Sequence, residues 1–452
     1  MPQEVIAVFD VGKTNKKFFL FDRSFKVVHQ TYIRFDEIPD DDGFHSEDLY
    51  ALANWIKQTF EEIISNQSYS VKAVNFSAYG ASLVHLDVKN ELATPFYNYL
   101  KPLPRTIEDK FLGHFKSKED FELRTASPYL GMLNSGIQLI YLKYAKPNLF
   151  QQVERTIHFP QYLSGIITGE FMTDYMSIGC HTGLWDFGNN DYSHWLTAEG
   201  VQSKLCQLKS DAFKMVSGVK VGRGIHDSSA ALMPYLSEHM DPFVLISTGT
   251  WNISMNPFNH EPLNSAELKL DCLNYMTSTG KSVKSTRLFL GNHLRETVKK
   301  LAEFFNVDYE DYKQIGWKPE RVNKCDSSRQ LLFDHKVLLP ERFGFTNSEQ
   351  SNFSMFPSFE LAVHQLFEEL TDLQVASLHV VLGDVKDIFV DGGFATSDLF
   401  LSLLAKKLPE HRIYSCEFGM GSALGAALQV SEHGLPEDYF KDHYKVKLWG
   451  TQ

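Results

Sequence analysis

Two segments that lie about half a chain apart follow one pattern: an apolar strand, a turn carrying glycine and threonine, and a second strand-like run. In the 452-residue sequence they read VIAVFDVGKTNKKFFLF, with its turn at Gly12, and PFVLISTGTWNISMNPF, with its turn at Gly249. Apolar runs on both sides of a short polar segment are typical of a β-hairpin. The repeat predicts two related lobes whose turns face one cleft. Because it is degenerate, two unrelated hairpins remain the alternative.

Strand and helix signals alternate over the rest of the chain, most clearly toward its C-terminus. Periodic apolar positions predict helices at 46–65, 359–382, 397–408 and 421–433, and short apolar runs predict strands at 71–76, 387–390 and 412–416. Residues 83–86 with the run from Leu92 onward predict another hairpin, whereas 101–218 is irregular and aromatic-rich. This alternation indicates an α/β architecture, which we divide into residues 1–238 and 239–452.

The tripeptide Gly12-Lys13-Thr14 looks like the end of a P-loop, but its surroundings exclude that motif. A P-loop needs a glycine five residues before Gly12, where this chain has Ala7, and a helix directly after the threonine. Here NKKFFLF follows, which favours a strand.

A hairpin turn of this composition can still hold phosphate. Gly12 permits close approach of a ligand, the turn N–H groups can cradle oxygens, and Thr14 and Asn15 add donors. Positive charge comes from Lys13 and Lys17, and Asp10 before the turn can hold Mg²⁺. The alternative is an ordinary turn, in which Asp, Gly and Asn are common.

Three later segments carry further candidate residues. In VKVGRGIHDSSAAL, Asp227 precedes a predicted helix, where it is either a general base that deprotonates a substrate hydroxyl or simply a helix N-cap. Gly249 and Thr250 form the second turn. In IFVDGGFATSDLF, Gly392 and Gly393 follow a strand and either admit a flat ligand against the backbone or make a tight connection.

Composition narrows the classes of partner and compartment. A formal net charge of −12 argues against nucleic-acid binding, and we interpret the loose cluster Lys281, Lys284 and Arg287 as a solvated face. The five cysteines are scattered without a CxxC pair, which indicates a reduced compartment and no zinc site. With no signal-like N-terminus and no membrane-length apolar run, we expect a cytoplasmic protein.

The order of these motifs resembles the FGGY carbohydrate kinases, of the actin, hexokinase and chaperone-ATPase superfamily, from Val5 to about Val430. DVGKTNKK is similar to that family's first phosphate motif, GIHDSSAAL to its catalytic segment, STGTW to its second phosphate motif and VDGGFATS to its adenosine motif. The resemblance implies two actin-like, ribonuclease H-like lobes around an ATP and sugar cleft. It implies Mg²⁺ at Asp10, and phosphate or nucleotide contacts at Gly12, Lys13, Thr14, Asn15, Lys17, Gly249, Thr250, Gly392, Gly393 and Ser397.

The wording of the motifs is closest to L-rhamnulose and L-fuculose kinases, which implies an ATP-dependent kinase acting on a small ketose with Asp227 as base. The substrate contacts implied are Tyr79, Ser82, His226, Asp227 and Ser228. Two departures stand out: Lys13 replaces a usual hydroxyl residue, and Ser82 replaces an acidic one. The alternative is a sugar-responsive or chaperone-like ATP-binding protein of the same superfamily, without catalysis. The oligomeric state is left open, with a homodimer as one option.

Overall fold

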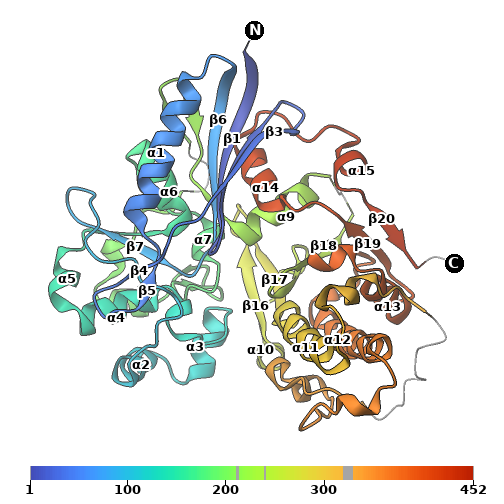
Figure 1. Ribbon diagram of the computed structural model, residues 1–452. Coiled ribbons are helices and arrows are strands. Elements are labelled where there is room, and N and C mark those ends of the chain that lie inside the picture. The colour runs from blue at the N-terminus through green and yellow to red at the C-terminus, as the bar shows by residue number, and fades with distance from the viewer. Residues whose placement is uncertain (1, 210–212, 239–240, 319–328, 451–452) are drawn as a thin grey trace.

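Two mixed β-sheets, each seven-stranded within the described residues, form the framework of the molecule (Figure 1). The computed structural model describes residues 2–209, 213–238, 241–318 and 329–450. The first sheet has the order β11-β12-β6-β1-β2-β3, and β13 also pairs with β6. Its strands are β1 (Gln3–Val11), β2 (Lys16–Phe21), β3 (Val27–Ile33), β6 (Tyr69–Ala78), β11 (Lys214–Val216), β12 (Val219–Val221) and β13 (Ile225–His226).

The second sheet is built from the C-terminal half of the chain, in the order β16-β17-β15-β14-β18-β19-β20. Its strands are β14 (Phe243–Thr248), β15 (Asn252–Asn256), β16 (Cys272–Met276), β17 (Ser282–Leu288), β18 (Asp387–Gly392), β19 (Arg412–Cys416) and β20 (Lys447–Trp449). Short two-stranded pairs lie outside both sheets: β4 (Ile38–Pro39) with β5 (His45–Ser46), β7 (Leu83–Leu86) with β8 (Arg155–His158), and β9 (Trp185–Asp186) with β10 (Asp191–Tyr192).

Helices cover both sheets and fill the space between them. In the first half they are α1 (Leu49–Ser65), α2 (Arg105–Leu112), α3 (Lys118–Arg124), α4 (Ile137–Ala145), α5 (Pro147–Gln152), α6 (Phe159–Thr168), α7 (Tyr175–Ile178), α8 (Trp195–Ala198) and α9 (Asp227–Glu238). In the second half they are α10 (Ser265–Lys269), α11 (Leu290–Phe305), α12 (Phe359–Leu382), α13 (Asp398–Lys407), α14 (Gly421–Val430) and α15 (Tyr439–His443). None of the helices in the described ranges combines the length and apolarity needed to cross a membrane.

The predicted repeat is confirmed as a structural one. β1 and β2 pair antiparallel with Asp10 opposite Lys17, and β14 and β15 pair antiparallel with Thr248 opposite Asn252. In each lobe the first strand of the hairpin then pairs in parallel with a later strand, β6 or β18. The predicted α/β fold of two actin-like lobes is therefore correct.

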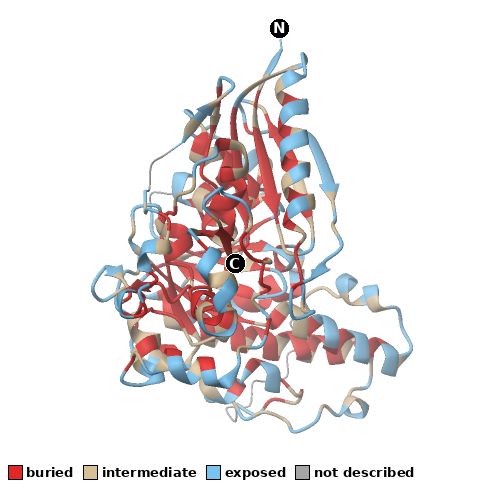
Figure 2. Cartoon of the chain, turned by 90° about the vertical axis from the view of Figure 1, so that its left-hand side faces the viewer, coloured by how far each residue is buried: buried red, intermediate tan, exposed pale blue. Residues whose placement is uncertain are grey.

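Helices α9 and α14 lie between the two sheets (Figure 1). Although α14 comes from the C-terminal half, Asn75 of β6 donates from Nδ2 to the carbonyl oxygen of Ala426 at 2.8 Å. One buried cluster joins Val8 of the first sheet to Leu245 of the second through α9 and α14. Figure 2 shows this continuous buried interior beneath exposed outer helix faces. The division between residues 238 and 239 stays a proposal.

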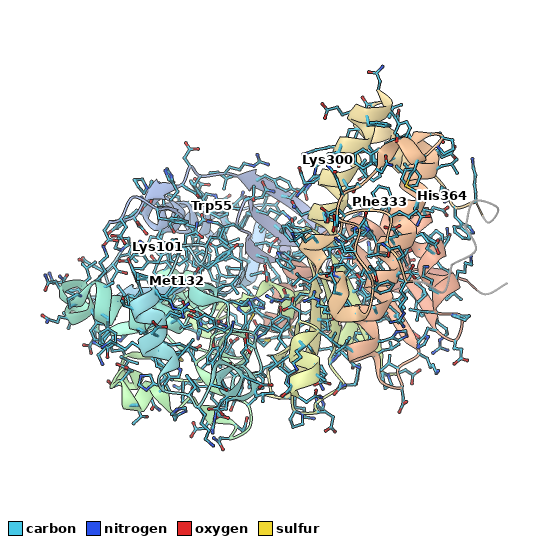
Figure 3. The ribbon with its side chains drawn as sticks, turned by 90° about the horizontal axis from the view of Figure 1, so that it is seen from below. Trp55, Lys101, Met132, Lys300, Phe333 and His364 are labelled. Carbon is cyan, nitrogen blue, oxygen red and sulfur yellow. The ribbon has the colours of Figure 1, made fainter. Side chains whose placement is uncertain are left out.

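Each half also has a buried cluster drawn almost entirely from its own residues. Seen from below in Figure 3, Trp55, Lys101 and Met132 lie on one side of the molecule, and Lys300, Phe333 and His364 on the other. Helix α1 shows why such faces form: its buried residues recur every three or four positions, and the Asp48 side chain caps its first turn.

Two expectations from the sequence are correct only in part. Residues 83–86 do turn back on Leu92, through an antiparallel bridge at Leu86 and an Ala93 N–H that donates to the His85 carbonyl at 2.9 Å. Leu92 begins no strand, however, and β7 pairs along its length with β8 instead. Of the predicted solvated cluster, Lys281 is exposed, but Lys284 and Arg287 are buried on β17. Lys284 pairs with Glu267 at 2.7 Å and Arg287 with Asp271 at 2.8 Å. Ion pairing allows such burial, and a one-dimensional pattern does not reveal it.

Candidate functional site

The C-terminal ends of three strands in the first sheet meet at one edge. Val11 of β1 lies beside Ala78 of β6, and Ala78 lies beside His226 of β13. The residues that follow these aligned positions are Gly12, Tyr79 and Asp227, three of the predicted site residues. Parallel pairing thus brings together residues that are up to half a chain apart, at the edge where α/β proteins bind ligands.

The first turn is a tight hairpin, as predicted. The Gly12 N–H donates to the Asn15 carbonyl at 3.0 Å, and a Cβ on Gly12 would lie only 3.1 Å from that oxygen. Thr14 is exposed at the tip of the turn, and Asn15 Oδ1 accepts a hydrogen bond from Arg34 Nε at 2.8 Å. The P-loop geometry, in which a helix follows the threonine, is absent from this described segment.

Lys13 is engaged by carboxylates of its own lobe. Its Nζ pairs with Glu37 and lies 3.6 Å from Glu47, which also pairs with buried Lys16 at 2.7 Å. Lys17 instead turns toward the strand end, where its Nζ lies 3.7 Å from Asp10. Of the two predicted phosphate-binding lysines, Lys17 is therefore the one beside the candidate metal ligand.

Asp10 is a buried carboxylate at the end of β1. It accepts a hydrogen bond from the Ser422 hydroxyl at 3.0 Å. Burial raises its pKa, Lys17 and Ser422 oppose that rise, and the nearby carboxylate of Asp227 adds to it. A carboxylate held in this way favours a cation at its free side.

Asp227 is the first residue of α9, and its side chain is 37% exposed. Its Oδ1 accepts the Ser228 N–H at 2.6 Å and lies 3.3 Å from His226 Nε2. Burial lowers the pKa of His226 although Asp227 opposes the shift, so the imidazole is neutral near pH 7. The His226 ring also contacts the Cys180 thiol at 3.2 Å, and burial keeps the pKa of that thiol high.

The other predicted substrate contacts flank this carboxylate. Tyr79 is buried against Phe159 at a ring distance of 4.9 Å, and burial raises the pKa of its hydroxyl well above the usual value. Ser82 is buried, and its hydroxyl has no hydrogen-bond partner among the described residues. Ser228 is half-buried, with its hydroxyl 3.3 Å from Asp227 Oδ1.

The second turn is exposed and rests on the start of α11. Gly249 and Thr250 are both exposed, and the Gly249 N–H donates to the Trp251 carbonyl at 2.9 Å. The Asn292 N–H donates to the Thr250 carbonyl at 3.1 Å. Only glycine fits at Gly291, because a Cβ there would lie 1.8 Å from the Gly249 carbonyl oxygen.

The glycine pair after β18 lies directly beside the second turn. Gly392 has a φ of 85° and is aligned with Thr248, whose carbonyl oxygen would be 1.9 Å from a Cβ on Gly392. The Thr248 hydroxyl accepts the Phe394 N–H at 2.9 Å, which ties the two segments together. Gly393 is exposed with open space at its Cβ position. Ser397 caps α13 by accepting the Phe400 N–H at 3.3 Å.

The start of α14 joins the two sides of the site. Ser422 bonds to Asp10 of the first lobe. A Cβ on the preceding Gly421 would lie 3.5 Å from Asp391, the last residue before the glycine pair. Helix α14 thus connects the end of β1, where Asp227 influences Asp10, with the segment that precedes the glycine pair of the second lobe.

Three polar residues of this region, Asn75, Ser422 and Asp391, were not predicted from the sequence. Asn75 is fully buried in β6, where its Oδ1 accepts the Gly224 N–H at 3.0 Å while Nδ2 holds α14. Ser422 also bonds across the lobes, to Asp10, and Asp391 accepts the hydroxyl of Tyr235 on α9. The available signal was a polar side chain inside an otherwise apolar run, such as the asparagine of AVNFSA.

The donor set fits the groups that the motifs imply. Asp10 offers the hard oxygen ligand that Mg²⁺ prefers. The turn N–H groups other than those of Gly12 and Gly249, which bond within their own turns, suit phosphate oxygens. The lone group of three carboxylates with metal-like spacing in the described ranges is Asp40, Asp41 and Asp42, where lysines occupy the carboxylates.

A two-lobed α/β fold, with one hairpin turn from each lobe and a carboxylate between them, defines the actin-like class. Residues 5–223 match the N-terminal domain of the FGGY family of carbohydrate kinases. L-fuculokinase of Salmonella typhi is 24% identical over 273 residues, which cover 56% of this chain and 57% of that protein. The chain thus spans little more than half the length of this curated relative.

Solved structures share the fold over nearly the whole chain. A carbohydrate kinase from Novosphingobium aromaticivorans superposes with a TM-score of 0.78 at 20% identity, covering 94% of this chain and 91% of that chain. Gluconate kinase from Lactobacillus acidophilus gives a TM-score of 0.80 at 15% identity, covering 100% and 94%. Xylulose kinase from the same organism gives 0.79 at 16% identity, covering 99% and 94%. At these identities the likeness concerns the fold.

Proposed function

We propose that the chain is an ATP-dependent kinase that phosphorylates a hydroxyl group of a small sugar, with Asp227 as general base. The observation that carries this proposal is the connection that helix α14 makes, through the Ser422–Asp10 hydrogen bond, between the end of β1 near Asp227 and the segment that precedes the glycine pair of the second lobe. The family match of residues 5–223 supports the same chemistry. If the two hairpins were ordinary turns without a ligand, the partly exposed carboxylate of Asp227 would have no role there.

In this mechanism the substrate hydroxyl attacks the γ-phosphorus of ATP as its proton passes to Asp227. A bond forms between the sugar oxygen and phosphorus, and the bond to ADP breaks. The Ser228 N–H donates to Asp227 Oδ1 at 2.6 Å, which leaves the other carboxylate oxygen to accept the proton. The N–H groups of the two turns, with Lys17, stabilise charge on the phosphoryl group. Mg²⁺ held at Asp10 would neutralise phosphate charge.

For the substrate we propose a ketose, such as L-rhamnulose or L-fuculose. The His226-Asp227-Ser228 wording and the L-fuculokinase relative support this class. Relatives of the same fold that act on xylulose and gluconate make a broad screen necessary. The same proposal includes ATP as co-substrate, Mg²⁺ as cofactor and the phosphate contacts assigned above. It also includes a nucleotide-binding role for Ser397.

The test is an ATP-consumption screen over ketoses, aldoses, polyols and sugar acids, with wild type and Asp227→Asn. Loss of the base should lower the turnover of the accepted sugar by about 10²- to 10⁴-fold while ATP still binds. The exposed carboxylate Glu62 on α1 provides a matched control, Glu62→Gln, which should behave as wild type. Near-normal turnover of Asp227→Asn would remove it from the base role. Activity on none of the compounds would favour a non-catalytic sensor or chaperone-like relative.

A further inference from the structure

A network of buried histidines ends beside the second turn. His293 lies in the first turn of α11, directly after Asn292, whose N–H donates to the Thr250 carbonyl, and Gly291, which packs against Gly249. Its position relative to the predicted phosphate turn is therefore fixed by backbone contacts.

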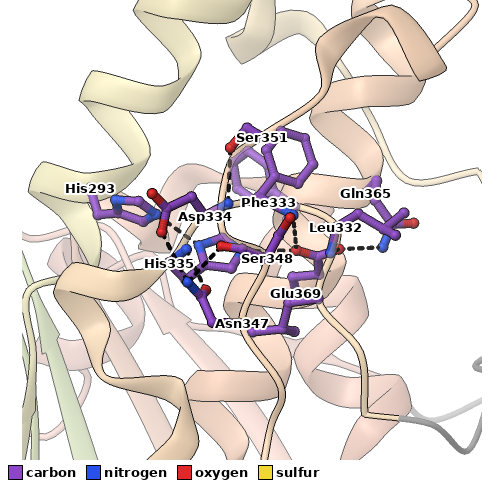
Figure 4. A network of polar contacts seen from close by, with 12 residues as sticks. His293, Leu332, Phe333, Asp334, His335, Asn347, Ser348, Ser351, Gln365 and Glu369 are labelled. Atoms are coloured by element: carbon purple, nitrogen blue, oxygen red, sulfur yellow. Dashed lines mark hydrogen bonds and ion pairs between the residues drawn. The ribbon is translucent and has the colours of Figure 1, made fainter.

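The network runs from α12 to His293 through one intermediate residue (Figure 4). Glu369, 3% exposed, lies 2.9 Å from Nε2 of His335, which is fully buried. Nδ1 of His335 lies 2.7 Å from Nε2 of His293. These two contacts form an unbroken line from a carboxylate to an imidazole that is half-buried.

The hydrogen bonds around Glu369 determine which nitrogens carry protons. Its oxygens accept the N–H groups of Leu332 at 2.9 Å and Phe333 at 3.1 Å, and the Gln365 amide at 2.8 Å. Surrounded by donors, the carboxylate is an acceptor, so His335 donates from Nε2. A neutral imidazole has one N–H. Nδ1 of His335 is then an acceptor, and His293 must donate to it from Nε2.

The remaining nitrogen of His293, Nδ1, is left with a free lone pair. Burial, followed by the influence of His335, lowers the pKa of His293 to about 4, so the ring is neutral near pH 7. No described residue bonds to this nitrogen. An oriented acceptor beside a ligand turn, held by buried groups, is suited to recognising a donor on the ligand.

We propose that the Glu369–His335–His293 network makes His293 Nδ1 a hydrogen-bond acceptor for a donor group of the bound nucleotide, either a ribose hydroxyl or the exocyclic amino group of the base. The proposal rests on the kinase function above for the identity of the ligand. His335 and Glu369 are positioning residues, because they act on the nucleotide through His293.

The first experiment measures the tautomer in the nucleotide-free protein. With ¹⁵N-labelled histidine, NMR correlations between ring protons and nitrogens distinguish a protonated Nε2 from a protonated Nδ1. His293 should carry its proton on Nε2 in wild type and lose that preference in His335→Phe. A proton on His293 Nδ1 in wild type would overturn the proposal, whatever the enzyme phosphorylates.

The second experiment measures binding of ATP, 2′-deoxyATP and ITP in the absence of sugar. One lost hydrogen bond should weaken binding of the analogue that lacks the donor by about 3- to 10-fold in wild type. His293→Phe should bind ATP that much more weakly and lose the discrimination, whereas His293→Asn should recover part of it. The exposed His379 on α12 gives the control, His379→Asn, with wild-type behaviour expected.

The outcomes separate this inference from the proposed function. If all three nucleotides bind equally to wild type and to His293→Phe, the inference is wrong even where sugar is phosphorylated. If replacing His293 abolishes the discrimination between nucleotides but no sugar is phosphorylated, the inference holds and the catalytic proposal fails. Absence of nucleotide binding in wild type would contradict both.

Discussion

Asp391 is a buried carboxyl at the end of β18, next to the glycine pair that we assign to the nucleotide. Its oxygens accept the Gly392 N–H at 2.6 Å and the Tyr235 hydroxyl at 3.2 Å. Burial outweighs these donors and raises the pKa from the usual 3.8 to about 7. At the scale of single residues, this group makes stability depend on pH in a direction opposite to that of an ion-paired aspartate.

The sign follows from proton binding. Between pH 4 and pH 7 the folded state holds a proton on Asp391 that the unfolded state has lost, so the free energy of unfolding falls as pH rises through this window. Asp391→Asn removes the titration. We expect the stability of the variant relative to wild type to rise by about 4 kcal/mol as the pH increases from 4 to 7.

Urea unfolding at several pH values measures this difference. Exposed Asp384, in the same half of the chain, serves as the control through Asp384→Asn. A difference between Asp391→Asn and wild type that does not change with pH would contradict the assignment.

At the scale of elements, the contact between α9 and α14 joins the lobes through their backbones. Gly425 permits this approach, because a Cβ there would lie 1.8 Å from the carbonyl oxygen of Ala230. The small residues of α14, among them Ala426 and Ala427, are buried, and α9 is the helix against which α14 packs.

Gly425→Ala should force the helices apart and lower the free energy of unfolding by about 1–3 kcal/mol. It should also impair turnover, because Ser422 on the same helix holds Asp10. Gly434→Ala, just beyond α14 where a Cβ has open space, is the control and should be neutral. Denaturant unfolding and the ATP assay measure both effects. Equal stability of the two variants would show that α14 can shift without cost.

At the scale of the whole molecule, the two halves share buried surface. The cluster around α9 and α14 combines Phe19 and Phe21 of β2 with Phe243 and Phe389 of the second sheet. A fragment of residues 1–238 lacks α14 and would expose the face of β6 and β1 on which it packs.

We therefore expect the fragments 1–238 and 239–452, expressed alone, to bind a hydrophobic dye and to unfold without a sharp transition, whereas the full chain unfolds cooperatively. Co-expression of both fragments should restore a sharp transition. Calorimetry checks this, and a cooperative transition in either fragment alone would mean that the lobes are independent folding units.

Local sequence patterns were sufficient to predict many of the helices and strands. The helix 359–382 and the strand 412–416 were predicted with the bounds that the structure has, because apolar periodicity and turn residues act over a few positions. The hairpin at Gly12 and the exclusion of a P-loop follow from the same short-range information. The ordered motifs also indicated an actin-like fold and the family whose N-terminal domain residues 5–223 match.

Long-range partners were not predictable in this way. The pairing of β7 with β8, the bond between Asp10 and Ser422, and the line from Glu369 through His335 to His293 each join residues far apart in sequence. So does the burial of Lys284 and Arg287 against carboxylates. The sequence by itself determined which residues can form strands, helices and ligand turns. Only the tertiary structure decided which of them meet, because that choice depends on how all the buried surfaces pack at once.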